Sequence, residues 1–475
     1  MPSLAALVKA YDVRGVVPDQ WDEDVARALG AAFAHVVGVD DLDAESGLRR
    51  VVVGHDMRAS SPGLAQAFAQ GVSSQGGDVT MIGLCSTDGL YYASGALDVP
   101  GAMFTASHNP AQYNGIKLCR AGARPVGQDT GLGEVRDLAE RYLDEGLPRL
   151  GKSGTVGERD VLAGYAAHLR GLVDLSGIRP LRVVVDAGNG MGGFTVPAVL
   201  EQGAGLAALP LQIIPLYFEL DGTFPNHEAN PLEPANLVDL QRAVLQHRAD
   251  IGLAFDGDAD RCFVIDERGA AVSPSAVTAL VAAREIAKER AAGRDPVVIH
   301  NLISSRAVPE TILEAGGTPV RTRVGHSFIK AQMAAERAVF GGEHSAHYYF
   351  RDFWYADTGM LAAMHVLAAL GEQDRPLSAL TARYERYVAS GEINSTVPDA
   401  LERTAAVRAH FEAAGVAVDE LDGTTLTLDQ PDGRPQWWLN LRASNTEPLL
   451  RLNVEAADEA TMTQVRDRAL AIIRA

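Results

Sequence analysis

The chain has 475 residues, of which 47% are hydrophobic and 22% charged, values typical of a folded globular protein and too apolar for a disordered one. Its 42 basic and 61 acidic side chains give a formal net charge of −19, which excludes nucleic acid and anionic membranes as expected partners because both require a basic surface. No apolar stretch reaches about 18 uninterrupted residues, so we expect no membrane span. At about 150 residues per domain, the length predicts three or four domains.

The cysteines and the N-terminal segment indicate a cellular compartment. Cys85, Cys119 and Cys262 lack CxxC spacing and are odd in number, so neither a disulfide scaffold nor a structural zinc site is expected. Residues Met1 to Gly15 lack the basic and apolar segments of a secretory signal. We therefore expect a cytoplasmic protein.

A loose internal repeat predicts the fold class. Apolar runs typical of buried strands occur at Arg50–Gly54, Leu181–Val185 and Pro296–His300. Each is followed by a helical stretch that ends near glycines and then by another predicted strand, at Val79–Ile82, Leu211–Ile214 and Val320–Val324. Strand, helix, glycine and strand is the order of a βαβ unit. Its recurrence predicts three related α/β domains.

After Val388 the pattern changes to that of a smaller α+β domain. An amphipathic helix is expected over Leu401–Ala414, strands over Thr424–Leu428 and Trp437–Leu441, and a closing helix from Asp458. The glycine- and proline-containing stretches 146–157 and 371–376 are candidate linkers. The expected domains are residues 1–150, 151–268, 269–383 and 384–475.

The first segment that can carry chemistry is Thr105–Lys117, T-A-S-H-N-P-A-Q-Y-N-G-I-K. It follows the apolar run Ala102–Phe104, so Ser107 lies just past the C-terminal end of a strand, where α/β domains bind ligands. Adjacent residues on extended backbone point in opposite directions, which argues against His108 as a direct base for Ser107. The G-x-S-x-G elbow of serine hydrolases is absent. A serine that is itself phosphorylated needs no such base, and the alternative is an ordinary polar turn, with Asn114-Gly115 as a second turn.

The strongest local signal is Phe255–Arg261, F-D-G-D-A-D-R. On extended backbone, Asp256, Asp258 and Asp260 would share one face, and three adjacent carboxylates require a cation. Hard oxygen donors suit Mg²⁺ or Ca²⁺.

Two alternatives compete with this metal site. An EF-hand loop would need glycine where Arg261 stands and helices on both sides, whereas Ile251–Phe255 and Cys262–Ile265 resemble strands. The other alternative is a solvated acidic turn. We prefer a metal ion that keeps open positions for a phosphate oxygen.

Two further segments suit a sugar phosphate. In Gly341–Phe350, G-G-E-H-S-A-H-Y-Y-F, the alternating Glu343, Ser345 and His347 can share a face and contact sugar hydroxyls; the alternative is a loop with a buried histidine. Arg442–Arg451, R-A-S-N-T-E-P-L-L-R, gathers guanidinium, hydroxyl and amide groups that suit a phosphate. The alternative there is a capped turn with surface arginines.

Together, T-A-S-H-N-P, D-G-D-A-D-R, G-E-H-S-A-H and R-A-S-N-T-E-P resemble the motifs of the α-D-phosphohexomutase family, bacterial phosphomannomutase/phosphoglucomutase in particular, in the family's order. The resemblance implies three related α/β domains plus a smaller C-terminal α+β domain around a central cleft. It also implies an intramolecular phosphotransferase that interconverts hexose 6-phosphate and hexose 1-phosphate. Alanine at position 346 and the aromatic residues that follow resemble the phosphomannomutase branch, which favours mannose with glucose alongside.

Site roles follow from the same resemblance. Ser107 would be the phosphoserine, joined to Mg²⁺ held by Asp256, Asp258 and Asp260. Arg14, Lys117 and Arg261 would line the reacting end, with Lys117 and His347 as proton-transfer candidates. Substrate binding would fall to Glu343, Ser345, His326, Arg442, Ser444, Asn445, Thr446 and Arg451.

The resemblance further implies a hexose 1,6-bisphosphate, both as intermediate and as activator, a monomer or homodimer, and a place in GDP-mannose biosynthesis. Phosphoglucosamine mutase is the nearest rival within the family. Outside it, a non-catalytic sugar-phosphate-binding protein and a metal-dependent phosphatase stay open.

Overall fold

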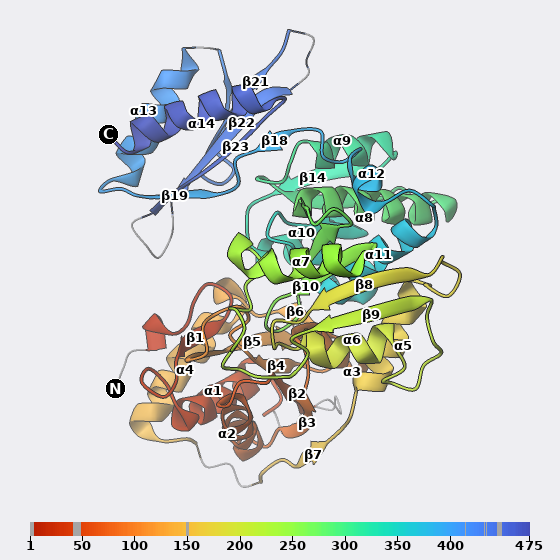
Figure 1. The fold of residues 1–475 in the computed structure, drawn as a ribbon. Coiled ribbons are helices and arrows are strands. Elements are labelled where there is room, and N and C mark those ends of the chain that lie inside the picture. The colour runs from red at the N-terminus through yellow and green to blue at the C-terminus, as the bar shows by residue number, and fades with distance from the viewer. Residues whose placement is uncertain are drawn as a thin grey trace. The chain divides into compact units, whose positions relative to one another are not determined.

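The computed structural model describes residues 4–40, 49–148, 152–413, 415–431, 433, 435–443 and 449–475 (Figure 1). The chain divides into two compact units. The first unit comprises Met1–Val272 and Ser345–Ser378, and the second comprises Ser273–His344 and Ala379–Ala475.

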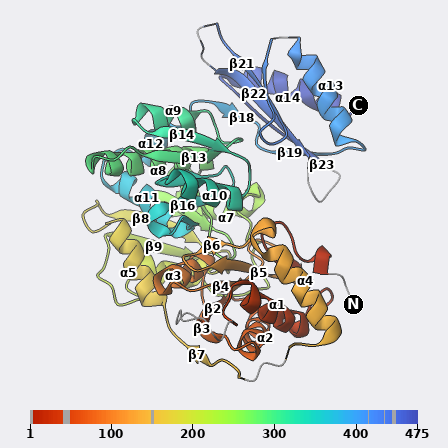
Figure 2. The same cartoon turned by 180° about the vertical axis from the view of Figure 1, so that it is seen from behind.

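The first unit begins with a mixed sheet that helices cover on both faces (Figures 1 and 2). Its strand order is β1 (Val13–Val16), β5 (Tyr113–Arg120), β4 (Gly101–Phe104), β2 (Arg50–His55), β3 (Asp78–Leu84) and β7 (Val156–Glu158), with β6 (Arg124–Pro125) beside β5. Strand β2 runs parallel to β3 and β4, whereas β5 is antiparallel to β1 and β4.

Alternate residues of the central strand β2 face different helices, which explains its continuous apolar run. Val51 and Val53 belong to the core formed with α1 (Glu23–Val36), α2 (Ser61–Ser74) and α4 (Leu132–Glu145). Val52 is equally buried, on the opposite face, where α3 (Thr87–Leu97) packs against β2, β4 and β5. Lys117 projects from β5 opposite Met103 and away from that helical core.

A second sheet completes the first unit. Its order is β12 (Ala271–Val272), β11 (Cys262–Asp266), β10 (Ile251–Phe255), β8 (Leu181–Asp186) and β9 (Leu211–Leu216). Strands β8, β9 and β10 are parallel, and β10 and β11 form an antiparallel hairpin. The helices are α5 (Leu162–Leu172), α6 (Gly192–Leu200) and α7 (Val238–His247). The later segment of this unit contains β16 (Tyr348–Phe350) and β17 (Ala356–Asp357), an antiparallel pair that is not part of this sheet, and helix α11 (Gly359–Gly371).

The second unit contains a parallel sheet and an antiparallel sheet. Strand β13 (Val297–Asn301) pairs with β14 (Thr318–Thr322) and β15 (Phe340–Gly342), with α8 (Pro274–Ala291), α9 (Ala307–Glu314) and α10 (His326–Glu336) against them. The other sheet contains β18 (Val388–Ala389), β23 (Leu449–Ala456), β22 (Pro435–Ala443), β21 (Thr424–Asp429) and β20 (Ala417–Asp419), with β19 (Ile393–Thr396) beside β23. Helices α13 (Ala400–Glu412) and α14 (Glu459–Ile473) pack on it.

The predicted α/β repeat and the C-terminal α+β arrangement are confirmed. Each predicted βαβ unit forms a parallel pair: β2 with β3, β8 with β9, and β13 with β14. The helices between them end beside left-handed glycines, for example Gly76 at φ 84° and Gly316 at φ 82°.

Two local predictions were wrong. The run predicted at Val320–Val324 is a strand only as Thr318–Thr322, because residues 323–325 lead into helix α10. Asn114-Gly115 lies inside β5 and is no turn. A Cβ at Gly115 would lie 2.4 Å from the carbonyl oxygen of Val13, so this glycine permits close strand approach.

Within the described residues, no helix has the length and apolar character needed to cross a bilayer.

Candidate active site

Ser107 lies in the loop after β4 with its side chain aimed at the second sheet of the same unit. Its Oγ donates a hydrogen bond to Oδ2 of Asp256 over 2.8 Å. The residue is buried and adopts a left-handed backbone conformation, φ 49°, which non-glycine residues rarely take. The fold therefore brings together two groups that are 149 positions apart in the chain, the hydroxyl of Ser107 and the acidic segment. The sequence analysis predicted that these two groups share an ion.

The three aspartates occupy the turn between β10 and β11. All three are buried, and their carboxylate oxygens lie within 4.8 Å of one another. Their convergence comes from this turn, in which Ala259 has φ 60°, and not from the alternation along extended backbone that we expected. The strands on both sides exclude an EF-hand.

A glycine lets this turn reach the serine loop. A Cβ on Gly257 would lie 2.3 Å from the carbonyl oxygen of Ser107, a distance that no side chain permits. Any residue larger than glycine at this position would push the two loops apart.

Two cations contact the aspartates. Nζ of Lys117 lies 2.7 Å from Oδ2 of Asp258 and 2.5 Å from Oδ2 of Asp260. Nε of Arg261 donates to Oδ2 of Asp256 over 2.9 Å, and its Nη2 lies 3.4 Å from Oγ of Ser107. Within the described part of the chain, three carboxylates thus face one lysine and one arginine.

These charges shift pKa values in opposite directions. Burial raises the pKa of Asp256 to about 7 against the opposing effect of Arg261. Burial also disfavours the charged form of Asp258, but Lys117 outweighs it and holds the pKa of this carboxyl below its usual value. Burial lowers the pKa of Lys117, but Asp258 and Asp260 outweigh it and the pKa stands above its ordinary value, so this side chain is a cation at neutral pH.

The oxygens that remain fit a divalent metal ion. Among the described residues, Oδ1 of Asp258 and Oδ1 of Asp260 are buried and accept no hydrogen bond. A buried carboxylate oxygen without a donor is costly unless it binds a cation. Three carboxylates and a hydroxyl are the hard oxygen ligands that Mg²⁺ takes, so the residues present suit that ion.

Arg14, His108 and His347 surround this centre. Nη1 of Arg14 donates to Oδ1 of Asn109, which lies in the same loop as Ser107. Nδ1 of His108 lies 3.3 Å from Oγ of Ser107, contrary to the expectation that the two side chains point apart, because the backbone at Ser107 is left-handed instead of extended. Burial, with help from Arg261, lowers the pKa of His108 to about 2, so the imidazole is neutral.

His347 reaches the metal loop from the turn after β15. Its Nε2 lies 3.7 Å from Oδ1 of Asp260, and its Nδ1 lies 3.1 Å from Oγ of Ser345. His347, Asp260 and Asp357 form a second cluster of potential metal ligands. Residues 343–346 form a turn in which Ala346 has φ 65°, so the expectation that Glu343, Ser345 and His347 share a strand face was wrong.

Sequence reasoning missed residues that support the centre. Thr87 donates from its hydroxyl to Oδ2 of Asp258 over 2.5 Å, and its amide donates to the carbonyl oxygen of the same residue. The neighbouring Asp88 accepts hydrogen bonds from Tyr165 and Thr358, each over 2.7 Å. The available signal was S-T-D after strand β3, a polar helix start at the ligand-binding edge of a sheet.

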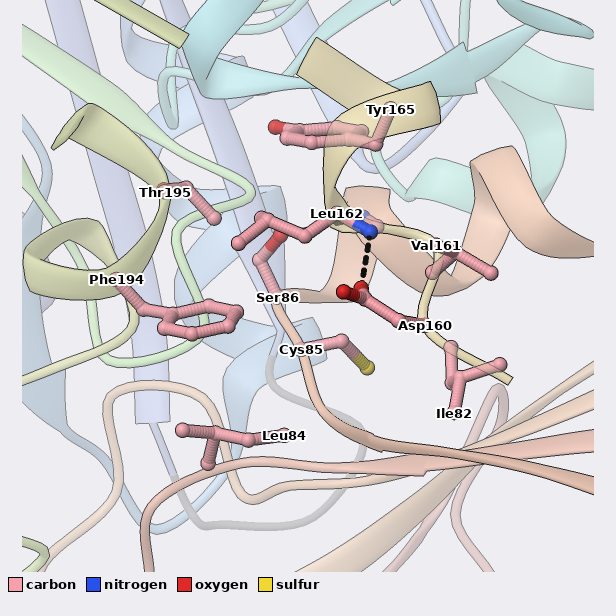
Figure 3. Close-up of a pocket in the computed structure, with 11 residues that line it drawn as sticks. Ile82, Leu84, Cys85, Ser86, Asp160, Val161, Leu162, Tyr165, Phe194 and Thr195 are labelled. Carbon is pink, nitrogen blue, oxygen red and sulfur yellow. Dashed lines mark hydrogen bonds between the residues drawn. The ribbon is translucent and has the colours of Figure 1, made fainter. Parts of the chain in front are cut away.

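A small cavity lies beside Ser86 and Tyr165, next to these supporting residues (Figure 3). In Figure 3, Ser86 and Tyr165 border it with Phe194 and Thr195 of α6, and Asp160 accepts a hydrogen bond from the amide of Leu162. Its volume of about 20 Å³ has room for about one water molecule. It is therefore too small for a hexose phosphate.

The second unit carries the remaining predicted residues. Glu343 is buried, and its Oε1 accepts from the amide nitrogen of Gly325 over 3.2 Å and from Nδ2 of Asn301 over 3.4 Å. Asn301, at the end of β13, is a further residue that the sequence analysis missed. His326 begins helix α10.

Arg442 on β22 and Arg451 on β23 are directly paired across the C-terminal sheet. Arg442 lies 3.6 Å from carboxylate oxygens of both Glu392 and Asp422, and Arg451 lies 3.6 Å from Glu392. The predicted phosphate ligands Ser444, Asn445 and Thr446 lie outside the described residues.

Comparisons with known proteins agree with this geometry. The chain matches the phosphoglucomutase/phosphomannomutase alpha/beta/alpha domain I over residues 5–142, domain II over 163–269, domain III over 274–387 and the C-terminal domain over 392–472. It is 40% identical over 461 residues to phosphohexose mutases of Xanthomonas campestris pv. campestris, covering 96% of both chains. It is 38% identical over 468 residues to a phosphomannomutase of Escherichia coli, covering 97% of both.

A solved structure shows the same fold. A phosphoglucomutase/phosphomannomutase family protein from Burkholderia thailandensis superposes with a TM-score of 0.85 at 30% identity, covering 100% of this chain and 98% of that one. The chain belongs to the phosphoglucomutase/phosphomannomutase family. It is a mutase, an enzyme that transfers a phosphoryl group.

Proposed function

We propose that this enzyme interconverts hexose 6-phosphate and hexose 1-phosphate through a phosphorylated Ser107 and a hexose 1,6-bisphosphate. We favour mannose as the sugar, with glucose also accepted. The observation that carries the proposal is the 2.8 Å hydrogen bond between Oγ of Ser107 and Asp256, in a buried trio whose remaining oxygens suit a divalent cation. A nucleophile of this kind needs no catalytic triad if positive charge stabilises the transferring group.

In the proposed first transfer, the Oγ–P bond of phosphoserine 107 breaks while the free hydroxyl of the sugar forms a new O–P bond. The proton of that hydroxyl passes to a side chain, for which His347 is the candidate. Lys117 is already protonated, so it is the candidate donor of the proton that the sugar oxygen takes up in the second transfer. Arg261 and Arg14 place positive charge beside the transferring group, as electrostatic stabilisation of phosphoryl transfer requires.

The second transfer runs in the opposite direction. The bisphosphate presents its other phosphate, the P–O bond to the sugar breaks, and Oγ of Ser107 is phosphorylated again while the sugar oxygen takes up a proton. Asp256, Asp258 and Asp260 would hold Mg²⁺, which when bound supplies positive charge to phosphoryl oxygens.

We assign the remaining predicted residues to substrate binding: Glu343, Ser345 and His326 to the sugar, and Arg442, Ser444, Asn445, Thr446 and Arg451 to the phosphate that is not transferred. Arginine suits that task because its guanidinium can bind two phosphate oxygens at once. We also keep the four-domain division at residues 150, 268 and 383 and the cytoplasmic location as proposals.

Intact mass spectrometry tests the phosphoserine. After incubation with hexose 1,6-bisphosphate, the wild type should carry one added phosphoryl group and Ser107→Ala none, and the variant should lose nearly all turnover. A fully active Ser107→Ala enzyme would remove the proposed nucleophile. A protein that never becomes phosphorylated would favour a sugar-phosphate-binding role, and stoichiometric release of inorganic phosphate would favour a phosphatase.

A panel of mannose, glucose and glucosamine phosphates tests the substrate. With bisphosphate activator present, we expect the highest kcat/KM for mannose phosphate. A strong preference for the amino sugar would replace our choice with phosphoglucosamine mutase.

A further inference from the structure

Arg58 is a buried cation that holds the serine loop from behind. It follows β2 on the same edge of the sheet as Ser107, and its side chain is 1% exposed. Its Nη1 and Nη2 each donate two hydrogen bonds to backbone carbonyls of a single loop. The acceptors are the carbonyl oxygens of Pro110 and Tyr113, each at 2.9 Å, Ser107 at 2.9 Å and Asn109 at 2.7 Å.

Other groups fix the guanidinium in this position. Nε of Arg58 lies 3.3 Å from Oδ2 of Asp56, which is fully buried. Oδ1 of Asp56 in turn accepts hydrogen bonds from Oγ of Ser61 over 2.6 Å and from the amide of Arg58 over 3.0 Å. The ring of Phe224 stacks on the guanidinium at 5.1 Å. The guanidinium group of Arg58 is thus oriented before any substrate binds.

The loop needs such support at Ser107 in particular. A left-handed non-glycine residue is strained and persists only where its surroundings determine the conformation. The carbonyl group of Ser107 is held between Nη2 of Arg58 and the backbone of Gly257, which together leave it little freedom to rotate. Rotation there would carry Oγ away from Asp256.

Arg58 does not serve the substrate directly. Its side chain is almost fully buried, and both terminal nitrogens are already engaged with loop carbonyls. Its charge is also matched by Asp56, so it offers no free positive charge to a phosphate. Its contribution must pass through the loop.

We infer that Arg58 is a positioning residue for the nucleophile: it holds the carbonyl groups of residues 107–113 so that Oγ of Ser107 stays aligned for phosphoryl transfer. This inference rests on the proposed phosphoserine mechanism. Misplacing a reacting atom by about 1 Å can cost about 10²-fold in rate, so the loss should appear in kcat. KM for hexose phosphate should change little, because Arg58 does not contact the sugar.

The test compares Arg58→Met, which removes every donor, with Arg58→Lys, which keeps the charge but cannot span four carbonyls. Arg120→Met is the matched control, because Arg120 also donates to two backbone carbonyls, those of Val36 and Thr130, remote from Ser107. For each protein we would measure the rate of Ser107 phosphorylation by hexose 1,6-bisphosphate, kcat and KM, melting temperature, and hydrogen exchange of the peptide 105–116.

We expect both Arg58 variants to be phosphorylated about 10²-fold more slowly, with faster exchange in the 105–116 peptide and KM near that of the wild type. Arg120→Met should keep the wild-type phosphorylation rate at whatever melting temperature it shows. The inference would be overturned if folded Arg58→Met were phosphorylated, and exchanged hydrogen in the 105–116 peptide, at the wild-type rates. If Arg58→Met does not fold, wild-type rates in Arg58→Lys would overturn the inference in the same way. If even the wild type is never phosphorylated, the proposed function fails, while unchanged exchange in the variants would still refute the role of Arg58.

Discussion

The hydroxyl of Thr87 donates a 2.5 Å hydrogen bond to Oδ2 of Asp258, so the first turn of helix α3 orients a carboxylate 171 positions later in the chain. The amide of Thr87 also donates to the carbonyl oxygen of Asp258, at 3.0 Å. Two bonds between the same residues fix both the backbone and the side chain of the metal loop. Groups that orient metal ligands in this way typically change metal affinity when they are removed.

Thr87→Val should therefore weaken binding of Mg²⁺ by about tenfold, because it removes the hydroxyl and keeps the shape and the backbone bond. Thr87→Ser should restore most of the affinity. Calorimetric titration of metal-free protein with Mg²⁺ measures the change independently of turnover.

Thr195→Val is the control, since the hydroxyl of this buried threonine donates to the carbonyl oxygen of Met191, the residue before helix α6. Equal Mg²⁺ affinities in wild type and Thr87→Val would show that the bond does not orient a metal ligand.

Lys117→Met should lower turnover and make the protein more dependent on Mg²⁺ for stability. The lysine ammonium contacts Oδ2 atoms of Asp258 and Asp260, so its loss removes one of the two cations described at the three buried carboxylates, and their charge is then less compensated until a metal ion binds. We expect turnover to fall by about 10²-fold or more if Lys117 transfers a proton. The rise in melting temperature on adding Mg²⁺ should be larger than in the wild type.

Lys288→Met is the control, because it removes a half-exposed lysine that lies 3.7 Å from Glu285 on α8. It should leave turnover and the Mg²⁺-induced rise in melting temperature unchanged. A smaller Mg²⁺-induced rise in Lys117→Met than in the wild type would mean that the lysine assists metal binding instead of competing with it.

Asp88 should make stability depend on pH in the direction opposite to that of most carboxylates. Burial raises the pKa of Asp88 to about 6, although Ser86, Thr358 and Tyr165 donate to it. A carboxyl with a raised folded-state pKa binds its proton more tightly when folded, so its contribution to stability is full below pH about 4 and is lost as pH rises towards 6. The shift corresponds to about 3 kcal/mol.

The melting temperature of Asp88→Asn relative to wild type should therefore rise between pH 4.5 and 7.5. Asp78→Asn is the control, because hydrogen bonds from Thr155 lower the pKa of Asp78 and keep it ionised throughout this range. If the difference in melting temperature between Asp88→Asn and wild type stayed constant over this pH range, the folded-state pKa of Asp88 would lie near its ordinary value.

Arg442→Ala should raise KM for hexose phosphate by about 10- to 100-fold with a smaller effect on kcat, since a charged hydrogen-bond donor to phosphate contributes about 1.5–3 kcal/mol. Steady-state kinetics with mannose 1-phosphate measures both constants. Arg408→Ala removes a more exposed arginine of the same sheet-and-helix layer, paired with Glu412 and Glu420, and should change neither. A pure kcat defect in Arg442→Ala would move this arginine from substrate binding to the chemical step.

Much of the fold was predictable because its signals are local. Runs such as Arg50–Gly54 and Leu181–Val185 each contain three consecutive valines because helices cover both faces of the sheet, and the helices between strands end near glycines. The strand Thr318–Thr322 was displaced in the prediction because Val324 continues the alternation of Val320 with polar residues beyond the point where the strand ends. Gly115 was mistaken for a turn residue because sequence alone does not show which neighbour approaches a glycine.

The nature of the site was also visible in the sequence, since D-G-D-A-D-R and T-A-S-H-N-P contain the carboxylates and the hydroxyl themselves. The geometry that we assumed for them was wrong in three places: the aspartates and Glu343 lie in turns, and Ser107 is left-handed. Left-handed residues such as Ala259 and Ala346 carry no local sequence signal, because alanine does not favour that conformation.

The chemistry that this protein can offer is readable from its amino-acid order: a hydroxyl after one strand, three carboxylates after another, and a repeated βαβ order, all of which are properties of neighbouring residues. The residues that hold those groups in place became visible only in the folded chain. Arg58, Thr87 and Asp88 act on partners 49 or more positions away, and such contacts depend on how strands and helices pack, which no local pattern encodes.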